Sequence, residues 1–479
     1  MKRAAVALVV LALGGTAAAT ATDRPDPNVQ AQADGCGRSV SGIYQQQVPN
    51  WAYVNDRSYP AAGPPPPPQW LHGVVDSKYK PFLSSHPTRE DDPVTHDSYD
   101  VNIDVLPDAA DKGLLGTAND AGRNEETSRV HTERESASLP TFVWPEPGDR
   151  VAMLGSWVWD CDHFAPAGER TELHPFRAVW VTKAVSPRSP TGESEGDLYI
   201  TTDPTPAGVI ADCAHETKGD QAAFKACLHA QPRWHDVSGD YSLTLPSPRK
   251  PAGGGALQAR VVDLGGPQPT VTLGPTGATV TLHLALSPGQ RLTVAKEIFL
   301  GWTHPARTAS PEHLRLRFRS LIVRRAMDPG GGGESILPKQ ISAAPGEWVV
   351  YWDVAGIWGN WNPLVLRVHD GQIVPGRQTI DFYAPRGRPW RMFAFVRECD
   401  FGSLAFSDQA QAPWPCPANP KEFGDAGGDD SPGVIVNRFA TPEAGIGLHK
   451  GIPLLTDNTC PRSNRKGCYE LDYVVTRVR

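Results

Sequence analysis

The sequence lacks an excess of basic residues. Its 479 residues include 46 Lys and Arg against 53 Asp and Glu, which gives a formal net charge of −7. A chain that binds nucleic acid or an anionic membrane over much of its surface usually carries the opposite sign. The composition therefore argues against both partners.

Long apolar runs are also scarce. The run at residues 4–15, AAVALVVLALGG, follows Lys2 and Arg3 and is too short for a membrane-spanning helix of ~20 residues. Small residues with an A-x-A pattern come next, which is typical of a secretory signal peptide cleaved after Ala19 or Ala21. An uncleaved anchor is the alternative. We expect a protein without a transmembrane segment that is secreted, periplasmic or attached to the cell envelope.

No two cysteines form a C-x-x-C pair, which disfavours zinc ribbons and thioredoxin-type redox motifs. An even number of cysteines in an exported chain indicates disulfide bonds. The eight cysteines are Cys36, Cys161, Cys213, Cys227, Cys399, Cys416, Cys460 and Cys468. Short loops favour the pairs Cys213–Cys227, Cys399–Cys416 and Cys460–Cys468, with Cys36–Cys161 left over, although eight cysteines permit about 105 connectivities.

The rest of the chain divides by composition. After the signal peptide (1–21), residues 22–69 form an arm rich in Ala, Gln, Gly and Pro that ends in the polyproline run 64–68. Residues 70–234 are dense in His, Asp and Glu and predict a β module. Residues 235–479 predict a β-sandwich region.

Alternating apolar residues indicate the fold class. The spacing of Leu314, Leu316 and Phe318 places all three on one face of a strand, and similar alternation recurs between turn signals as far as the C-terminus. Only residues 221–230 look helical. The sequence predicts a mainly β protein with antiparallel β modules, a C-terminal β-sandwich and little helix.

Residues 148–181 predict a β-hairpin with a polar loop. Asp160 and His163 leave its first strand, while Glu172 and His174 enter its second. Residues two apart in a strand face the same side. Two imidazoles and two carboxylates are ligand types of zinc, manganese or iron. We predict a divalent-metal site, with zinc preferred, at Asp160, His163, Glu172 and His174.

The coordination would decide the role of this site. Three protein ligands plus water would suit hydrolysis, with Glu172 as the preferred base and Glu133 as its rival. Four protein ligands would be structural. Upstream, His131, Glu133 and Glu135 share one face of another expected strand. Without a metal, the histidines would be hydrogen-bonded in a polar hairpin, with Glu172 paired to Arg170 or Arg177.

The hairpin carries a signature at Gly155, Trp157, Val158, Asp160, His163, Glu172, Leu173, His174 and Pro175. An upstream stretch follows a related pattern in an altered register, at His96, Asp97, Asp100, Asn102, Val105, Pro107 and Asp108. In these residues the chain resembles a family of uncharacterised bacterial secreted or envelope-associated modules. The resemblance covers roughly residues 90–180 and, more loosely, the terminal β-sandwich; it implies a site in the hairpin and implies no activity.

Two other features suggest weaker sites. Gly192–Gly196 matches G-x-S-x-G, but a strand follows Ser194 where a hydrolase elbow requires a helix. Residues 424–433 hold three aspartates in a turn, for which a solvated turn is favoured over a calcium site. These aspartates are Asp425, Asp429 and Asp430.

A tryptophan-rich stretch bears on sugar binding. Trp348 and Trp352 share a strand face and are expected in the core, whereas Trp358 and Trp361 are expected at an exposed turn, where they could stack on a sugar.

The sequence thus favours a binding or structural protein with a divalent metal and with an extracellular ligand or envelope component as its partner. The alternatives are a metal-dependent extracellular hydrolase and a carbohydrate- or envelope-binding module.

Overall fold

The computed structural model describes residues 51–54, 67–76, 100–116, 119, 129–135, 139–165, 168–202, 222–223, 226, 236–303, 311–326, 346–398, 434–453 and 468–478. Within these ranges the chain is mainly strand, with a few 3₁₀ turns and little helix, and the predicted fold class is confirmed. No helix among the described residues has the length and apolar composition needed to cross a bilayer.

The strands of the first half of the chain run from β1 to β12. Their bounds are β1 Trp51–Tyr53, β2 Gln69–Val75, β3 Asp100–Pro107, β4 Val130–Glu135, β5 Arg150–Ala165, β6 Gly168–Lys183, β7 Ser194–Thr201, β8 Gly239–Pro246, β9 Leu257–Gly265, β10 Thr270–Gly274, β11 Gly277–Leu284 and β12 Thr293–Trp302. The 3₁₀ turns η4 (Ala109–Leu114) and η7 (Thr141–Val143) lie among them.

The strands of the second half run from β13 to β21. They are β13 Glu312–Arg325, β14 Gly346–Val354, β15 Ile357–Val368, β16 Ile373–Pro375, β17 Thr379–Ala384, β18 Trp390–Glu398, β19 Val434–Phe439, β20 Gly447–Gly451 and β21 Cys468–Arg477, with the 3₁₀ turn η9 at Glu443–Gly445.

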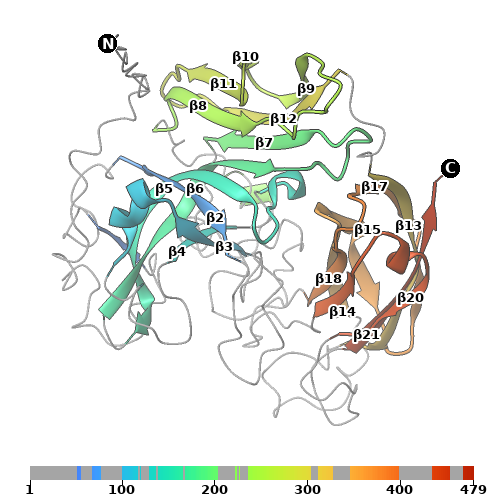
Figure 1. The fold of residues 1–479 in the computed structure, drawn as a ribbon. Helices are drawn as coiled ribbons and strands as arrows, with labels where there is room; N and C mark the ends of the chain where they lie inside the picture. The colour runs from blue at the N-terminus through green and yellow to red at the C-terminus, as the bar shows by residue number, and fades with distance from the viewer. Residues whose placement is uncertain are drawn as a thin grey trace, which may run out of the picture.

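The described strands form four sheets (Figure 1). Sheet A has nine strands in the order β1-β5-β2-β3-β4-β6-β7-β12-β9, and sheet B has the order β10-β11-β8. Sheet C contains β16-β13-β21-β20 with β17 also paired to β13, and sheet D has the order β15-β14-β18-β19. Every described strand pair is antiparallel except β4 with β6, which run parallel.

The predicted hairpin is confirmed as β5 and β6, which pair antiparallel within sheet A. The strand pairings set the boundary of the sandwich differently from the composition. Of the strands that the composition assigns to the C-terminal sandwich region, β9 and β12 extend sheet A, and sheet B packs against sheet A. The C-terminal sandwich therefore consists of sheets C and D and begins at β13. Composition could not show this, because β12 pairs with β7, with Thr293 opposite Thr201.

Sheet D is buried on both faces. In β14, Trp348, Val350 and Trp352 pack against sheet C, while the alternate residues Val349 and Tyr351 pack against side chains of sheet A. Period-2 alternation normally separates a buried face from a wet one. Here it separates two cores, so sheet D joins the sandwich to the first half of the molecule.

Because sheet D is packed between sheet C and side chains of sheet A, one sequence prediction is wrong. Trp358 and Trp361, expected at an exposed turn, are only 4% and 2% exposed within β15. Trp358 contacts Trp144 and Phe393, and Trp361 contacts Phe318. The prediction was wrong because the local turn pattern does not show that β15 is covered from both sides. The predicted burial of Trp348 and Trp352 is confirmed.

Candidate metal centre

Three neighbouring strands bring acidic and histidine side chains to one face of sheet A. Along β3, Ile103 lies in the core and Asp104 next to it faces the other side; β4 and β6 alternate in the same way. Asp104 lies opposite His131 in the β3–β4 register, and His131 lies opposite Glu172 in the parallel β4–β6 register. Because residues two apart share a face, Glu133 and His174 join the same group. We call these five residues the His–Glu cluster: Asp104, His131, Glu133, Glu172 and His174.

A carboxylate orients the His131 ring. Its Nδ1 lies 2.9 Å from Asp104 Oδ1, while Nε2 lies 3.7 Å from Glu133 Oε2. The first distance is a hydrogen bond and the second is too long for one. An imidazole held through Nδ1 by a carboxylate, with Nε2 directed at other donors, is the usual arrangement of a metal-binding histidine.

His174 is held in a parallel way. Its Nδ1 lies 3.1 Å from Glu172 Oε1, and its Nε2 lies 3.8 Å from Glu133 Oε1. The two imidazoles therefore approach the Glu133 carboxylate through their Nε2 atoms, one at each oxygen. Glu133 is the centre of the cluster.

Three of the five residues are close enough to share an ion. One donor atom each from His131, Glu133 and Glu172 lies within 4.8 Å of the others. Donors on one zinc ion lie within roughly 4 Å of each other, because each bond is about 2 Å long. Small side-chain rotations would close this gap. The cluster is also accessible on one side, since the His131 side chain is 26% exposed while that of Glu172 is 6% exposed.

The carboxylates also set the charge of His131. Burial of the imidazole opposes protonation, but Asp104, Glu133 and Glu172 outweigh burial and raise the pKa of His131 well above 6.5. Without a metal, the carboxylates therefore favour the protonated form of this ring. A divalent ion would replace that proton with a larger positive charge at the same place.

The structure brings together half of the predicted ligand set. Glu172 and His174 lie in the cluster, and the rival base Glu133 lies between His131 and His174. The side chains of Asp160, His163 and Glu135 lie outside the described residues, although all three belong to strands. Asp425, Asp429 and Asp430 also lie outside them, so the calcium prediction stays untested.

Sequence reasoning missed Asp104. The signal was present, since Asp104 alternates with the apolar core residues Ile103 and Val105 of β3 and so marks that strand's second face as polar. Among the cysteines, Cys468 is the one whose side chain is described; it is buried and disulfide-bonded, with a partner outside the described residues. The predicted connectivity therefore remains a prediction.

A second acidic group lies near the far end of β6. Glu195, Asp197 and Glu297 also come within 4.8 Å of one another. Two permanent cations hold this group: Lys183 Nζ lies 2.8 Å from Asp197 Oδ2, and Arg188 contacts both Glu195, at 2.9 Å, and Glu297. We call these five residues the Lys–Arg cluster. It is an internal ion-pair network whose cation positions are filled by side chains.

Ser194, the nucleophile position of the discounted G-x-S-x-G motif, lies beside this network. It is buried as the first residue of β7, and its hydroxyl donates to the Pro246 carbonyl at 2.6 Å. A hydroxyl committed to a backbone carbonyl in a strand is structural, which agrees with the sequence reasoning.

Comparison with known proteins adds no family. No protein-family model and no curated protein matches the chain. Among solved structures, the chain is similar to one of extended synaptotagmin 2 that contains an SMP domain and two C2 domains, with 8% sequence identity over 80% of this chain and 84% of that chain and a TM-score of 0.19. A TM-score of that size carries no argument, so function has to be argued from the side chains.

Proposed function

We propose that the protein binds a divalent transition-metal ion in the His–Glu cluster, through His131 Nε2 and the carboxylates of Glu133 and Glu172. The observation that carries this proposal is the double orientation of the histidines. Asp104 holds Nδ1 of His131 and Glu172 holds Nδ1 of His174, so both Nε2 atoms are directed at Glu133.

The types of ligand limit which metal ions suit the site. One imidazole and two carboxylates suit zinc, manganese or iron better than calcium, which takes six or more oxygens. In this assignment Asp104 fixes the His131 ring, while His174 hydrogen-bonds to Glu172 and borders Glu133. His174 changes from the ligand proposed on sequence grounds to a neighbour of two ligands.

A binding role agrees best with these contacts, and metal-dependent hydrolysis is the second candidate. One observation favours hydrolysis: three ligands on a partly exposed face would leave a coordination position for water, with His174 close enough to accept its proton. Sugar binding loses its support, because the two tryptophans that suggested it are buried. Export remains a proposal that rests on residues 1–21.

Metal content tests the proposal directly. The chain without residues 1–21 is stripped with chelator, dialysed against zinc or manganese and analysed for bound metal. We expect one ion per chain in the wild type and none in His131→Ala or Glu133→Gln, because each change removes a ligand. His174→Ala should keep the ion with weaker affinity.

The matched control is His283→Ala, which removes a histidine that also pairs with an aspartate but lies exposed on β11. It should bind metal like the wild type. If His131→Ala retains a full equivalent of metal while folded, the ligand assignment is overturned. Metal-dependent turnover of ester or phosphate substrates that disappears in Glu133→Gln would favour the hydrolase.

A further inference from the structure

The outer face of sheet C differs from the rest of the described surface. Eight large apolar side chains are exposed in the described part of the chain, and three of them, Ile446, Leu448 and Ile452, lie on or beside β20. They alternate with Lys450 at every second position, so all four share the outer face. Strand β20 is also the last strand of its sheet. Exposed apolar residues grouped on a sheet edge mark a contact surface.

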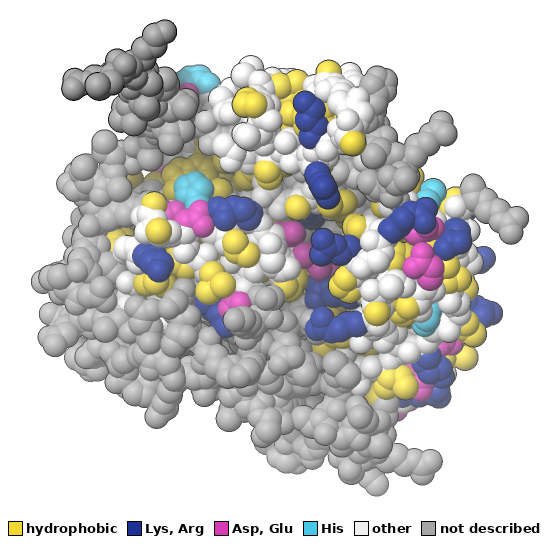
Figure 2. Space-filling model, in the orientation of Figure 1, with side chains coloured by type: hydrophobic (Ala, Val, Ile, Leu, Met, Phe, Trp, Pro, Cys, Tyr) yellow, Lys and Arg dark blue, Asp and Glu magenta, His cyan; other side chains and the backbone are white. Residues whose placement is uncertain are grey.

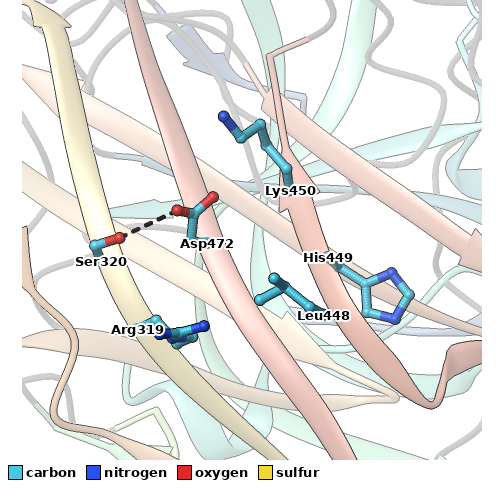
Figure 3. A pocket seen from close by; sticks show the side chains of 6 residues that line it. All are labelled: Arg319, Ser320, Leu448, His449, Lys450 and Asp472. Atoms are coloured by element: carbon cyan, nitrogen blue, oxygen red, sulfur yellow. Dashed lines mark hydrogen bonds between the residues drawn. The ribbon is translucent and has the colours of Figure 1, made fainter.

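A hollow lies beside these residues. It has a volume of about 420 Å³ and is lined by Arg319 and Ser320 of β13, Leu448, His449 and Lys450 of β20, and Asp472 of β21. Figure 3 shows Leu448 pointing toward Arg319 across β21, while His449 points away. The Ser320 hydroxyl donates to Asp472 at 3.4 Å on the floor of the hollow.

Most of the cations on this face contact a carboxylate. Arg315 lies 2.6 Å from Asp381, Arg324 lies 2.9 Å from Glu470 and Lys450 lies 2.8 Å from Glu470. Arg317 and Arg319 are exposed on the same strand and contact no carboxylate within the ranges that the structure describes. Figure 2 shows basic side chains gathered with acidic ones over the sandwich at the right. The face thus has unmatched positive charges at Arg317 and Arg319.

We propose that this face docks an extended acidic segment of a partner protein. The segment's carboxylates would contact Arg317 and Arg319, an apolar side chain would pack on Leu448, and a backbone N–H would donate to Asp472. A peptide supplies all three groups, whereas a simple anion supplies only the first. A second copy of this chain fits poorly, because it would bring two more unmatched arginines to the interface.

The test uses a fluorescein-labelled peptide, Glu-Leu-Glu-Leu-Glu-Leu, and a matched peptide with lysine in place of glutamate, both measured by fluorescence anisotropy. We expect the acidic peptide to bind at least tenfold more tightly than the basic one, and binding to weaken as salt screens the charges. Arg317→Glu and Arg319→Glu should each weaken binding at least tenfold, and Leu448→Ser about threefold.

Arg249→Glu is the control, because it makes the same charge change at an exposed position between β8 and β9. It should bind like the wild type. Equal binding of the two peptides, or equal loss in Arg249→Glu and Arg319→Glu, would overturn the proposal. It would also be overturned by a dimer in sedimentation analysis that Arg319→Glu dissociates, or by binding to phosphatidylserine vesicles that the acidic peptide does not displace.

Discussion

Sheet A holds two acidic clusters that differ in what balances their charge. Each contains three carboxylates, and β6 contributes to both, with Glu172 and His174 in one and Lys183 in the other. In the Lys–Arg cluster the balancing groups are permanent cations that lie between the carboxylates. In the His–Glu cluster they are imidazoles, which can give up a proton and bind a metal. The same number of carboxylates therefore produces an ion-pair network in one place and a candidate metal centre in the other.

The largest effect should come from removing a cation of the Lys–Arg cluster. Lys183 is 5% exposed and contacts Asp197 and Glu195, so Lys183→Met leaves buried carboxylates without their partner. Breaking a buried pair in this way costs about 3–5 kcal/mol of unfolding free energy. Denaturant unfolding measures it, with the exposed Lys112→Met as control. A loss below about 1 kcal/mol would mean that the network is much less important for stability than its burial implies.

Metal should stabilise only through the His–Glu cluster. At a zinc concentration one hundred times the dissociation constant, binding should raise the unfolding free energy by about 2.7 kcal/mol. Glu133→Gln should abolish this gain, because the carboxylate between the two imidazoles is lost. Glu297→Gln changes the Lys–Arg cluster instead and should leave the gain intact. Thermal unfolding with and without zinc separates the two clusters, and an equal loss in both variants would refute the comparison.

Orientation of His131 should have a smaller effect. Asp104→Asn keeps the size of the side chain but weakens the hydrogen bond to Nδ1 and removes a charge. Metal affinity should fall about 10- to 100-fold, as is usual when the group behind a metal-binding histidine is altered. Titration calorimetry checks this. Unchanged affinity in Asp104→Asn would show that Asp104 does not position the ligand.

The two clusters should also differ in how their stability depends on pH. In the Lys–Arg cluster, burial and the neighbouring Glu195 charge raise the pKa of Asp197 from 3.8 to about 8, despite Lys183. Between these two values the folded state binds a proton that the unfolded state has released. The stability from this group is therefore present at low pH and is lost as pH rises toward the raised pKa. Asp197→Asn should flatten this decline by about 1.4 kcal/mol per pH unit at most, as measured by denaturant unfolding across that range.

Metal affinity should change with pH in the opposite direction. His131 must release its proton before Nε2 can bind an ion, and its pKa is raised by the surrounding carboxylates. Zinc affinity should therefore increase with pH up to the raised pKa of His131. Titration calorimetry between about pH 6 and pH 8 would detect this increase in zinc affinity. A flat profile would contradict the assignment of His131 as a ligand.

Local pattern predicted much of the fold. Alternation in β13 placed Leu314, Leu316 and Phe318 in the core, and all three are fully buried. The hairpin of β5 and β6 was also predictable, because its strands are neighbours in the sequence. The same reasoning placed Glu172 and His174 on one face of β6, where they contact each other.

The centre of the candidate site was less accessible to sequence reasoning. His131 and Glu133 were recognised as sharing a strand face, but nothing local shows that β4 lies parallel to β6, which starts more than thirty residues later. The register of such a pair depends on tertiary packing. The same limit explains Trp358, whose burial depends on sheet A side chains far away in the sequence.

Sheet D has a practical consequence for anyone dividing this protein into pieces. Its strand β14 contributes Val349 and Tyr351 to one core and Trp348 and Val350 to the other. A cut between β12 and β13 would therefore remove sheet D from the core of the first half and expose aromatic side chains of the second half to solvent. We expect the two halves to melt in a single cooperative transition. Fragments ending near residue 303 or beginning near residue 311 should aggregate when expressed alone.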